Sequence, residues 1–157
     1  MKIRKMRKQI MILLLMFIIV TKAEKSYAWG KTGHELVAKI AYQLLDDSTR
    51  KMVKEYLGNI SFEEASVWMD EQRGNSYYNY MRTWHYLDMD KGEKYVPSAE
   101  RNVMTVLHSA INELRNYKTN GMSKKDIKNR ILVIFHLVGD LHQPLHTGYA
   151  IDKGGNT

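Results

Sequence analysis

The chain has 157 residues, with 24 Lys and Arg against 17 Asp and Glu, and it contains no cysteine. This length suits one domain with a hydrophobic core but not two, and the absence of cysteine excludes disulfides and thiolate metal sites. Residues 1–28 hold seven Lys or Arg and one Asp or Glu, so they contribute all but about +1 of the formal net charge of +7. The basic balance therefore does not indicate a nucleic-acid-binding surface.

The first 28 residues have the three-part layout of a secretory signal peptide. Met1–Gln9 carries five basic residues, residues 10–20 are an unbroken apolar stretch, and Ser26-Tyr27-Ala28 ends the segment. Eleven apolar residues are too few to span a bilayer as a helix, which needs about 20. We predict cleavage between Ala28 and Trp29, and hence a secreted or periplasmic protein. An uncleaved membrane anchor is the alternative.

Helical periodicity marks the first half of the remaining chain. Residues 33–46 are predicted to form a helix with one buried apolar stripe, and residues 48–57 a shorter helix that ends at Gly58-Asn59. Ser61 with Glu64 indicates a capping box, which opens a helix running to about Arg73. The predicted stripe consists of Leu36, Val37, Ile40, Ala41, Leu44 and Leu45.

The second half begins with less regular segments. Residues 74–81 are polar and Tyr-rich, which predicts a loop, and residues 84–89 fit either a short strand or an extended turn. Pro97-Ser98 precedes a predicted helix that runs to about Tyr117. Ser123 caps the last long helix, whose residues 131–138 are apolar nearly all round, so we expect it at the middle of a bundle. With no internal repeat and no convincing set of strands, we predict an all-α, single-domain protein over residues 29–157.

Residues 136–146 read His-Leu-Val-Gly-Asp-Leu-His-Gln-Pro-Leu-His and carry the clearest chemistry. His136 and Asp140 stand four residues apart, so on a helix they share one face and can bind one ion. His146 follows just after Pro144. Neutral imidazole and carboxylate are the ligands that zinc uses in catalytic sites, where an open position holds a water.

Other candidates are ambiguous when each is taken alone. Cleavage before Trp29 would free an α-amino group with a pKa of about 8, and His34 is close enough along the chain to share an ion with it. Taken alone, Asp70 is more typical of a solvated carboxylate, and His85 fits a buried hydrogen-bonding histidine as well as it fits a ligand. Among the remaining histidines, we expect a structural role for His108 and a second-shell or helix-end role for His142.

Four motifs occur together in a specific order: Trp29-Gly30 with Gly33-His34, then Trp68-Met69-Asp70-Glu71, then His85-Tyr86-Leu87-Asp88, then residues 136–146. In this combination the chain from Trp29 to Thr157 resembles the zinc-dependent single-strand-specific nucleases of fungi, plants and bacteria (nuclease S-one/P-one type). The resemblance implies a mostly helical fold, shared with zinc-dependent phospholipase C, that carries three zinc ions in a cleft.

The resemblance also implies a ligand set. Asp70, His85, His136 and Asp140 would hold one zinc ion. Trp29, through its amine and carbonyl, would hold another together with His34, and Asp140 would bridge these two ions. His146 would supply the first ligand of the third zinc.

By the same resemblance, the chain is a secreted endonuclease that hydrolyses single-stranded DNA and RNA to 5′-phosphorylated products through a metal-activated hydroxide. Asp88 matches a catalytic aspartate beside the scissile phosphate and could orient the attacking water, with Asp140 as the second catalytic residue. Tyr86 stands where an aromatic ring stacks on a base, and Asn156 matches a polar residue near the phosphate. We expect a monomer without stable membrane association after signal cleavage.

The chain departs from the family pattern at one point. A downstream His-x-x-x-Asp motif should complete the third zinc site, but no histidine follows His146. We therefore expect two complete zinc sites and a third that lacks its downstream ligands, in a chain truncated at the C-terminus. The alternatives are a phosphodiesterase similar to zinc-dependent phospholipase C and an inactive truncated metal-binding remnant. The short spacing from Trp29 to His34 and the position of Asp88 favour the nuclease.

Overall fold

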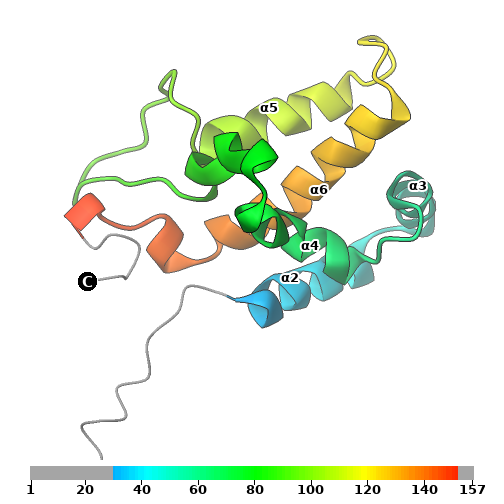
Figure 1. Cartoon of the computed structure of the whole chain (residues 1–157), viewed down its shortest axis with the longest axis horizontal. Helices are drawn as coiled ribbons and strands as arrows, with labels where there is room; N and C mark the ends of the chain where they lie inside the picture. Colours follow the sequence, from blue (N-terminus) through cyan, green and yellow to red (C-terminus); the bar gives the residue numbers. More distant parts are fainter. Residues whose placement is uncertain (1–29, 152–157) are drawn as a thin grey trace, which may run out of the picture.

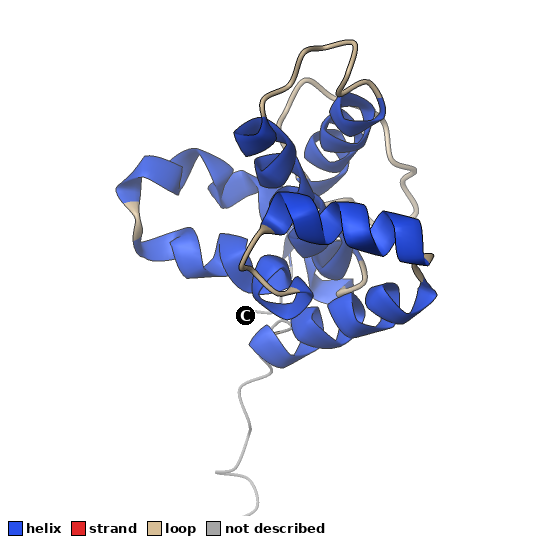
Figure 2. Ribbon diagram, turned by 90° about the vertical axis from the view of Figure 1, so that its right-hand side faces the viewer, coloured by secondary structure: helices blue, strands red, loops and turns tan. Residues whose placement is uncertain are grey.

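The fold, given by a computed structural model, is described for residues 30–151, and it contains helices and no strand within that range (Figures 1 and 2). The predicted signal peptide, Trp29 and Asn156 lie outside the described residues. The prediction of an all-α fold is confirmed. In chain order the elements are α2 (Lys31–Leu44), α3 (Asp47–Leu57), α4 (Phe62–Glu71), the 3-10 helices η1 (Gln72–Gly74) and η2 (Ser76–His85), α5 (Val103–Arg115), α6 (Lys124–Leu141) and the 3-10 helix η3 (Pro144–His146).

Helix α6 lies at the centre of the bundle, as its nearly continuous apolar sequence predicts. It packs against α2, α3 and α4 on one side and against α5 on the other (Figure 1). Two hydrophobic clusters share its surface. The first joins α4, η2, α5 and α6 and includes Met69, Met81, Trp84, Val103, Val106, Leu107, Ala110, Val133 and Leu137. The second joins α2, α3, α4 and α6 and includes Ala38, Leu57, Phe62, Ala65, Ile127, Ile131 and Leu132.

Side-chain caps set where the helices begin. Ser61 and Glu64 form the predicted capping box, and the Ser123 hydroxyl accepts a hydrogen bond from the Asp126 N–H at the start of α6. Helix α5 begins at Val103, later than Pro97-Ser98 suggested, because the Asn102 side chain is the cap and accepts a bond from the third residue of the helix.

The loop predicted over residues 74–81 is wrong for most of its length, since residues 76–85 form η2. The Asn75 side chain accepts a hydrogen bond from the Tyr77 N–H at the start of this helix. In a 3-10 helix side chains three apart lie on one face, so Tyr78, Met81 and Trp84 form a single row that packs into the first cluster. The polar residues between them hide this period of three in the sequence.

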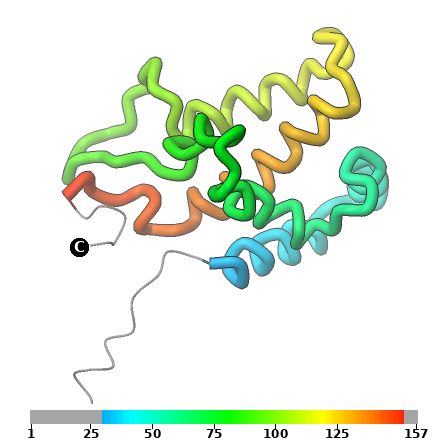
Figure 3. Tube along the Cα trace, in the orientation of Figure 1, coloured from blue at the N-terminus to red at the C-terminus, as the bar shows by residue number. Residues whose placement is uncertain are grey.

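Both alternatives for residues 84–89 are wrong at residues 84 and 85, which end η2, whereas residues 86–89 follow as a segment that forms no strand. The Leu87 N–H donates to the His146 carbonyl (2.8 Å) and the Met89 N–H to the Gly148 carbonyl (3.0 Å). Figure 3 shows the two segments meeting at the left edge of the molecule. These bonds join the segment after His85 to the segment after η3.

The predicted buried stripe of α2 is wrong for much of its length. Leu36, Ile40 and Leu44 are 56%, 50% and 81% exposed, whereas the buried residues of this helix are His34 and Ala38. The face that packs on α4 and α6 is thus the face that carries His34, and no other element among residues 30–151 covers Leu36, Ile40 and Leu44. Within the same range, none of the helices combines the length and apolar character that crossing a membrane requires.

These burial differences predict a large loss of stability for one Leu→Ala variant and almost none for another. Leu137 is fully buried in the first cluster, so Leu137→Ala is expected to lower the free energy of unfolding by about 2–5 kcal/mol. Leu44→Ala is expected to change it by less than about 0.5 kcal/mol, because the Leu44 side chain is already in solvent. Urea unfolding followed by circular dichroism measures both values, and a large loss for Leu44→Ala would show that its face of α2 is covered.

Candidate metal centre

The histidines and carboxylates predicted from the sequence gather where α2, α4 and α6 meet. Three of the imidazoles and one carboxylate are almost completely buried, which is unusual for side chains of this polarity unless they are paired or bind a metal. His34 comes from α2, Asp70 from α4, His85 from the end of η2, His136 and Asp140 from α6, and His146 from η3.

The Asp140 carboxylate lies at the centre of this group, with two histidines facing each of its oxygens. Its Oδ2 atom is 3.1 Å from His85 Nδ1 and 3.2 Å from His136 Nε2. Its Oδ1 atom is 3.4 Å from His34 Nε2 and 3.8 Å from His146 Nε2. One carboxylate can therefore serve two neighbouring ions, one on each oxygen.

The donor atoms on the Oδ2 side have the spacing of a zinc site. His85 Nδ1 and His136 Nε2 are 3.0 Å apart, so they form a nearly equilateral triangle with Asp140 Oδ2. Ligand atoms at about 2.0–2.1 Å from a tetrahedral zinc lie about 3.3 Å from one another. The donor set and its dimensions thus fit a bound zinc ion.

Asp70 supplies a fourth donor on the same side. Its Oδ1 atom lies 3.6 Å from His136 Nε2 and 4.0 Å from His85 Nδ1. The same atom is 2.7 Å from the Arg73 guanidinium, an ion pair that lacks hydrogen-bond geometry. Asp70 is therefore held near the triangle while its oxygen remains available to a metal.

A backbone contact orients His136. Its Nδ1–H donates to the carbonyl of Ser66, a buried residue of α4, over 2.7 Å. Because this bond fixes the tautomer, Nε2 is left free to face Asp140, as in metal-binding histidines whose second nitrogen is held by a carbonyl. The sequence offered no signal for Ser66, since its backbone and not its side chain makes this contact.

Gly139 allows α2 to approach α6 closely enough to bring in His34. The His34 ring stacks on the His136 ring, with centroids 4.2 Å apart and planes 12° from parallel. A Cβ atom at position 139 would overlap His34 Nδ1, which is buried and has no hydrogen-bond partner among the described residues. Sequence reasoning missed Gly139, although a glycine inside an apolar helix, next to a candidate ligand, is a signal of close packing.

The surroundings of the cluster favour an ionised Asp140. Burial opposes its ionisation, but hydrogen bonds from His136, His34 and His85 outweigh this and hold the pKa of Asp140 far below its usual range. Burial also opposes protonation of His136, but the hydrogen bond and charge of Asp140 prevail and raise the pKa of His136. A cation bound here would take the place of the imidazole proton.

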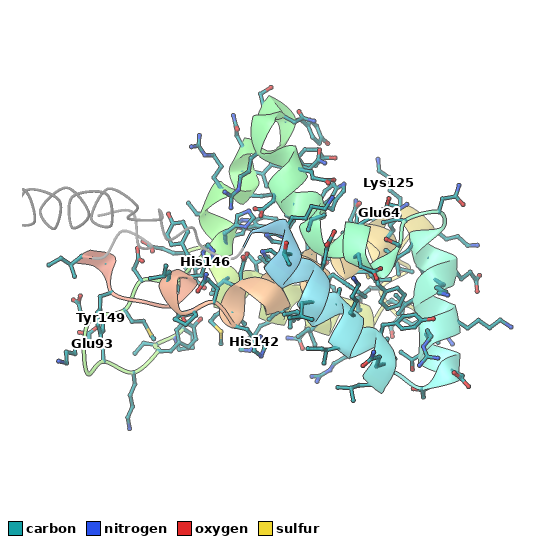
Figure 4. The ribbon with its side chains drawn as sticks, turned by 90° about the horizontal axis from the view of Figure 1, so that it is seen from below. Glu64, Glu93, Lys125, His142, His146 and Tyr149 are labelled. Atoms are coloured by element: carbon teal, nitrogen blue, oxygen red, sulfur yellow. The ribbon has the colours of Figure 1, made fainter. Side chains whose placement is uncertain are left out.

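His146 lies on the Oδ1 side of the cluster. Burial lowers the pKa of His146 and so favours the neutral imidazole, the form that binds metals. His142 lies on the opposite side of the end of α6 (Figure 4), where its Nδ1–H donates to the Val138 carbonyl over 2.7 Å. This is the helix-end role expected for His142.

Two predicted site residues lie at the surface beside the cluster. Tyr86 and Asp88 belong to the extended segment that follows His85, and both side chains are exposed, Tyr86 by 40%. The backbone bond between Leu87 and His146 places this segment next to η3. The structure therefore brings together His34, Asp70, His85, His136, Asp140 and His146, with Tyr86 and Asp88 at the rim.

The contact between Gly139 and His34 yields a prediction. Replacing glycine by alanine inside a helix normally stabilises it by about 1 kcal/mol, but we expect Gly139→Ala to destabilise the protein by about 1–3 kcal/mol, because the added methyl group displaces His34. Gly74→Ala is the matched control, since a methyl group there meets no atom within 4 Å. Urea unfolding and zinc titration of both variants provide the test, and a Gly139→Ala protein of unchanged stability and zinc affinity would contradict it.

Comparison with known proteins places this arrangement in a family. The sequence matches the family model described as S1/P1 Nuclease over residues 29–157. It is 32% identical to Endonuclease 2 of Arabidopsis thaliana, over 86% of this chain and 51% of that protein. It is 27% identical to Nuclease S1 of Aspergillus oryzae, over 85% of this chain and 49% of that protein. The chain thus spans about half the length of the curated relatives it matches, and it belongs to the S1/P1 nuclease family.

Proposed function

We propose that the chain is a zinc-dependent endonuclease that hydrolyses phosphodiester bonds in single-stranded DNA and RNA to 5′-phosphorylated products. One observation carries the proposal: the buried Asp140 carboxylate lies between two pairs of histidines. Membership of a nuclease family supplies the reaction class, and the imidazole and carboxylate donors favour zinc. The names of the relatives, which are endonucleases and nucleases, agree with this proposal.

The two sides of Asp140 suggest the division of the ligands. His85, His136 and Asp70, with Asp140 Oδ2, would hold one zinc ion. His34 and Asp140 Oδ1 would hold a second ion together with the amine and carbonyl of Trp29. His146, on the same side as Oδ1, would begin a third site. When bound, zinc lowers the pKa of a bound water to near neutral and places a positive charge opposite the phosphodiester.

The chain's own residues then orient the reacting groups. Asp140 fixes the positions of the imidazoles around it, and the Ser66 carbonyl keeps His136 in the tautomer that presents Nε2. Asp88, exposed at the rim, would accept a hydrogen bond from the attacking water and aim it at the phosphorus. Tyr86 would stack on the base next to the scissile bond, a contact that needs an unstacked base and so favours single strands.

We further propose that residues 1–28 act as a signal peptide that directs export and is removed by cleavage after Ala28. The proposal rests on the basic start, the apolar stretch and the small residues before Trp29. It links export to activity, because the Trp29 nitrogen becomes a metal donor only after its peptide bond is cut.

The first prediction from this function concerns Asp140. Asp140→Asn is expected to lose more than about 100-fold in hydrolysis of a single-stranded oligonucleotide, because second-shell changes alone cost 10–100-fold and Asp140 contacts both sites. Zinc content should fall further in Asp140→Asn than in His146→Ala. His108→Ala, at an exposed histidine of α5, is the control and should change neither quantity.

Several outcomes would refute this assignment. Cleavage of phosphatidylcholine without cleavage of single-stranded DNA would indicate a phospholipase. Bound zinc without any turnover would indicate a metal-binding remnant. A larger zinc loss in His146→Ala than in Asp140→Asn would reverse the assigned ligand roles.

The second prediction concerns the new N-terminus. A protein that begins at Trp29 is expected to bind more zinc than the full chain and to hydrolyse single-stranded DNA, whereas the uncleaved chain should be inactive. Metal analysis and nuclease assays on the two proteins make the comparison. Equal zinc content and equal activity would show that the Trp29 amine is not a ligand.

A further inference from the structure

Helix η2 has three faces, because a 3-10 helix has three residues per turn. The row of Tyr78, Met81 and Trp84 is buried or partly buried in the first cluster. A second row ends in His85, a donor of the metal centre. The third row contains Tyr77, Tyr80 and Thr83 and is directed to solvent.

The solvent-facing row exposes large aromatic surfaces. Tyr77 is 75% exposed and Tyr80 is 58% exposed. Their rings are restrained by edge-to-face contacts, with centroids 5.0 Å apart between Tyr77 and Tyr78 and 5.3 Å apart between Tyr80 and Trp84. We call Tyr77 and Tyr80 the tyrosine row. Exposed tyrosines held by aromatic neighbours that are buried or partly buried form a preorganised contact surface.

Helix η2 itself carries an arginine and no carboxylate. Residues 72–87 contain two arginines, Arg73 and Arg82, and no aspartate or glutamate. The Arg73 side chain is 61% exposed and Arg82 is exposed. Arg73 is ion-paired with Asp70, and Asp70, Glu71 and Asp88 border this stretch, so Arg82 is the cation that η2 itself offers to a phosphate.

We propose that the tyrosine row is a base-stacking site that carries single-stranded nucleic acid to the metal centre, in addition to the base contact at Tyr86. This inference rests on the proposed nuclease function and specifies how its substrate is bound. Exposed aromatic rings bind single strands without sequence preference, and Arg82, on the same helix, is exposed and can meet the phosphate backbone. The tyrosine row leads along η2 toward the metal centre, since η2 ends at His85 and Tyr86 follows it directly. A nucleic-acid strand bound along the row would therefore reach the metal centre.

The spacing of the row would favour single strands over duplexes. Residues three apart in a 3-10 helix are about 6 Å apart along the axis, close to two stacking distances of about 3.4 Å. A base can stack on either tyrosine ring only after it has left its own stack. A duplex, whose bases are stacked on each other, cannot do this without being opened.

The test uses the zinc-loaded protein that begins at Trp29. It compares by fluorescence anisotropy the binding of two phosphorothioate oligonucleotides of equal length and charge, oligo(dT) and an abasic strand. Each tyrosine is expected to contribute about fivefold or more to the affinity for oligo(dT). Tyr77→Ala with Tyr80→Ala should thus weaken oligo(dT) binding at least about 20-fold and leave the abasic strand unchanged. Tyr77→Phe with Tyr80→Phe keeps the rings and should bind normally.

Two controls separate stacking from damage to the fold. Tyr149→Ala removes another exposed tyrosine, which lies beside Glu93 in Figure 4, and should leave binding unchanged. Tyr77→Ala alone avoids the contact that Tyr80 makes with Trp84, so its fivefold loss should occur with an unaltered circular dichroism spectrum. An equal loss for both oligonucleotides, no loss for either, or no binding of either by the unaltered protein would each overturn the proposal.

Hydrolysis of a base-free phosphodiester, such as methyl 4-nitrophenyl phosphate, distinguishes this proposal from the proposed nuclease activity. The tyrosine variants should hydrolyse it as fast as the unaltered protein. If neither the unaltered protein nor the variants hydrolyse this diester while the alanine variants still lose oligo(dT) binding, the stacking site stands and the nuclease function fails. If it is hydrolysed and oligo(dT) binding is unaffected, the nuclease function stands and the tyrosine row is not a binding site.

Discussion

The buried carboxylate of Asp140 is the constraint on which the rest of the structure depends. An ionised carboxylate in the protein interior is costly unless cations or hydrogen-bond donors surround it. Here four imidazoles from α2, η2, α6 and η3 surround it within 3.8 Å. Elements far apart in the sequence therefore converge on one residue of α6, and the fold and the site have the same centre.

The two hydrophobic clusters hold this polar centre in place. Helices α4 and α6 contribute to both clusters, so the backbone that carries Asp70, His136 and Asp140 is packed from two sides. The Ser66 carbonyl orients His136 by a hydrogen bond, and the absence of a side chain at Gly139 leaves room for His34. Precise donor geometry thus comes from ordinary packing around α4 and α6, with few specialised residues.

Local signals made part of this arrangement predictable. The Ser61 and Ser123 caps and the four-residue spacing of His136 and Asp140 act over one helical turn, so the sequence displays them directly. Other features depend on tertiary contacts. The face of α2 that is buried was decided by His34 and Gly139 and not by its leucines, and η2 formed because Tyr78, Met81 and Trp84 had a cluster to pack into. Neither determinant is visible from hydrophobic periodicity alone.

The outward face of α2 has a consequence for how the protein responds to metal supply. With Leu36, Ile40 and Leu44 largely in solvent, the apolar contact of α2 is confined to one narrow face that includes Ala38 and Tyr42, and His34 provides its ion-pair contact with α6. If that contact is strengthened by zinc, the free energy of ion binding is added to the docking of α2 in particular. At low zinc concentration, α2 would then undock before the rest of the bundle and become accessible to proteases. The rate at which the protein is degraded would therefore depend on the surrounding zinc concentration.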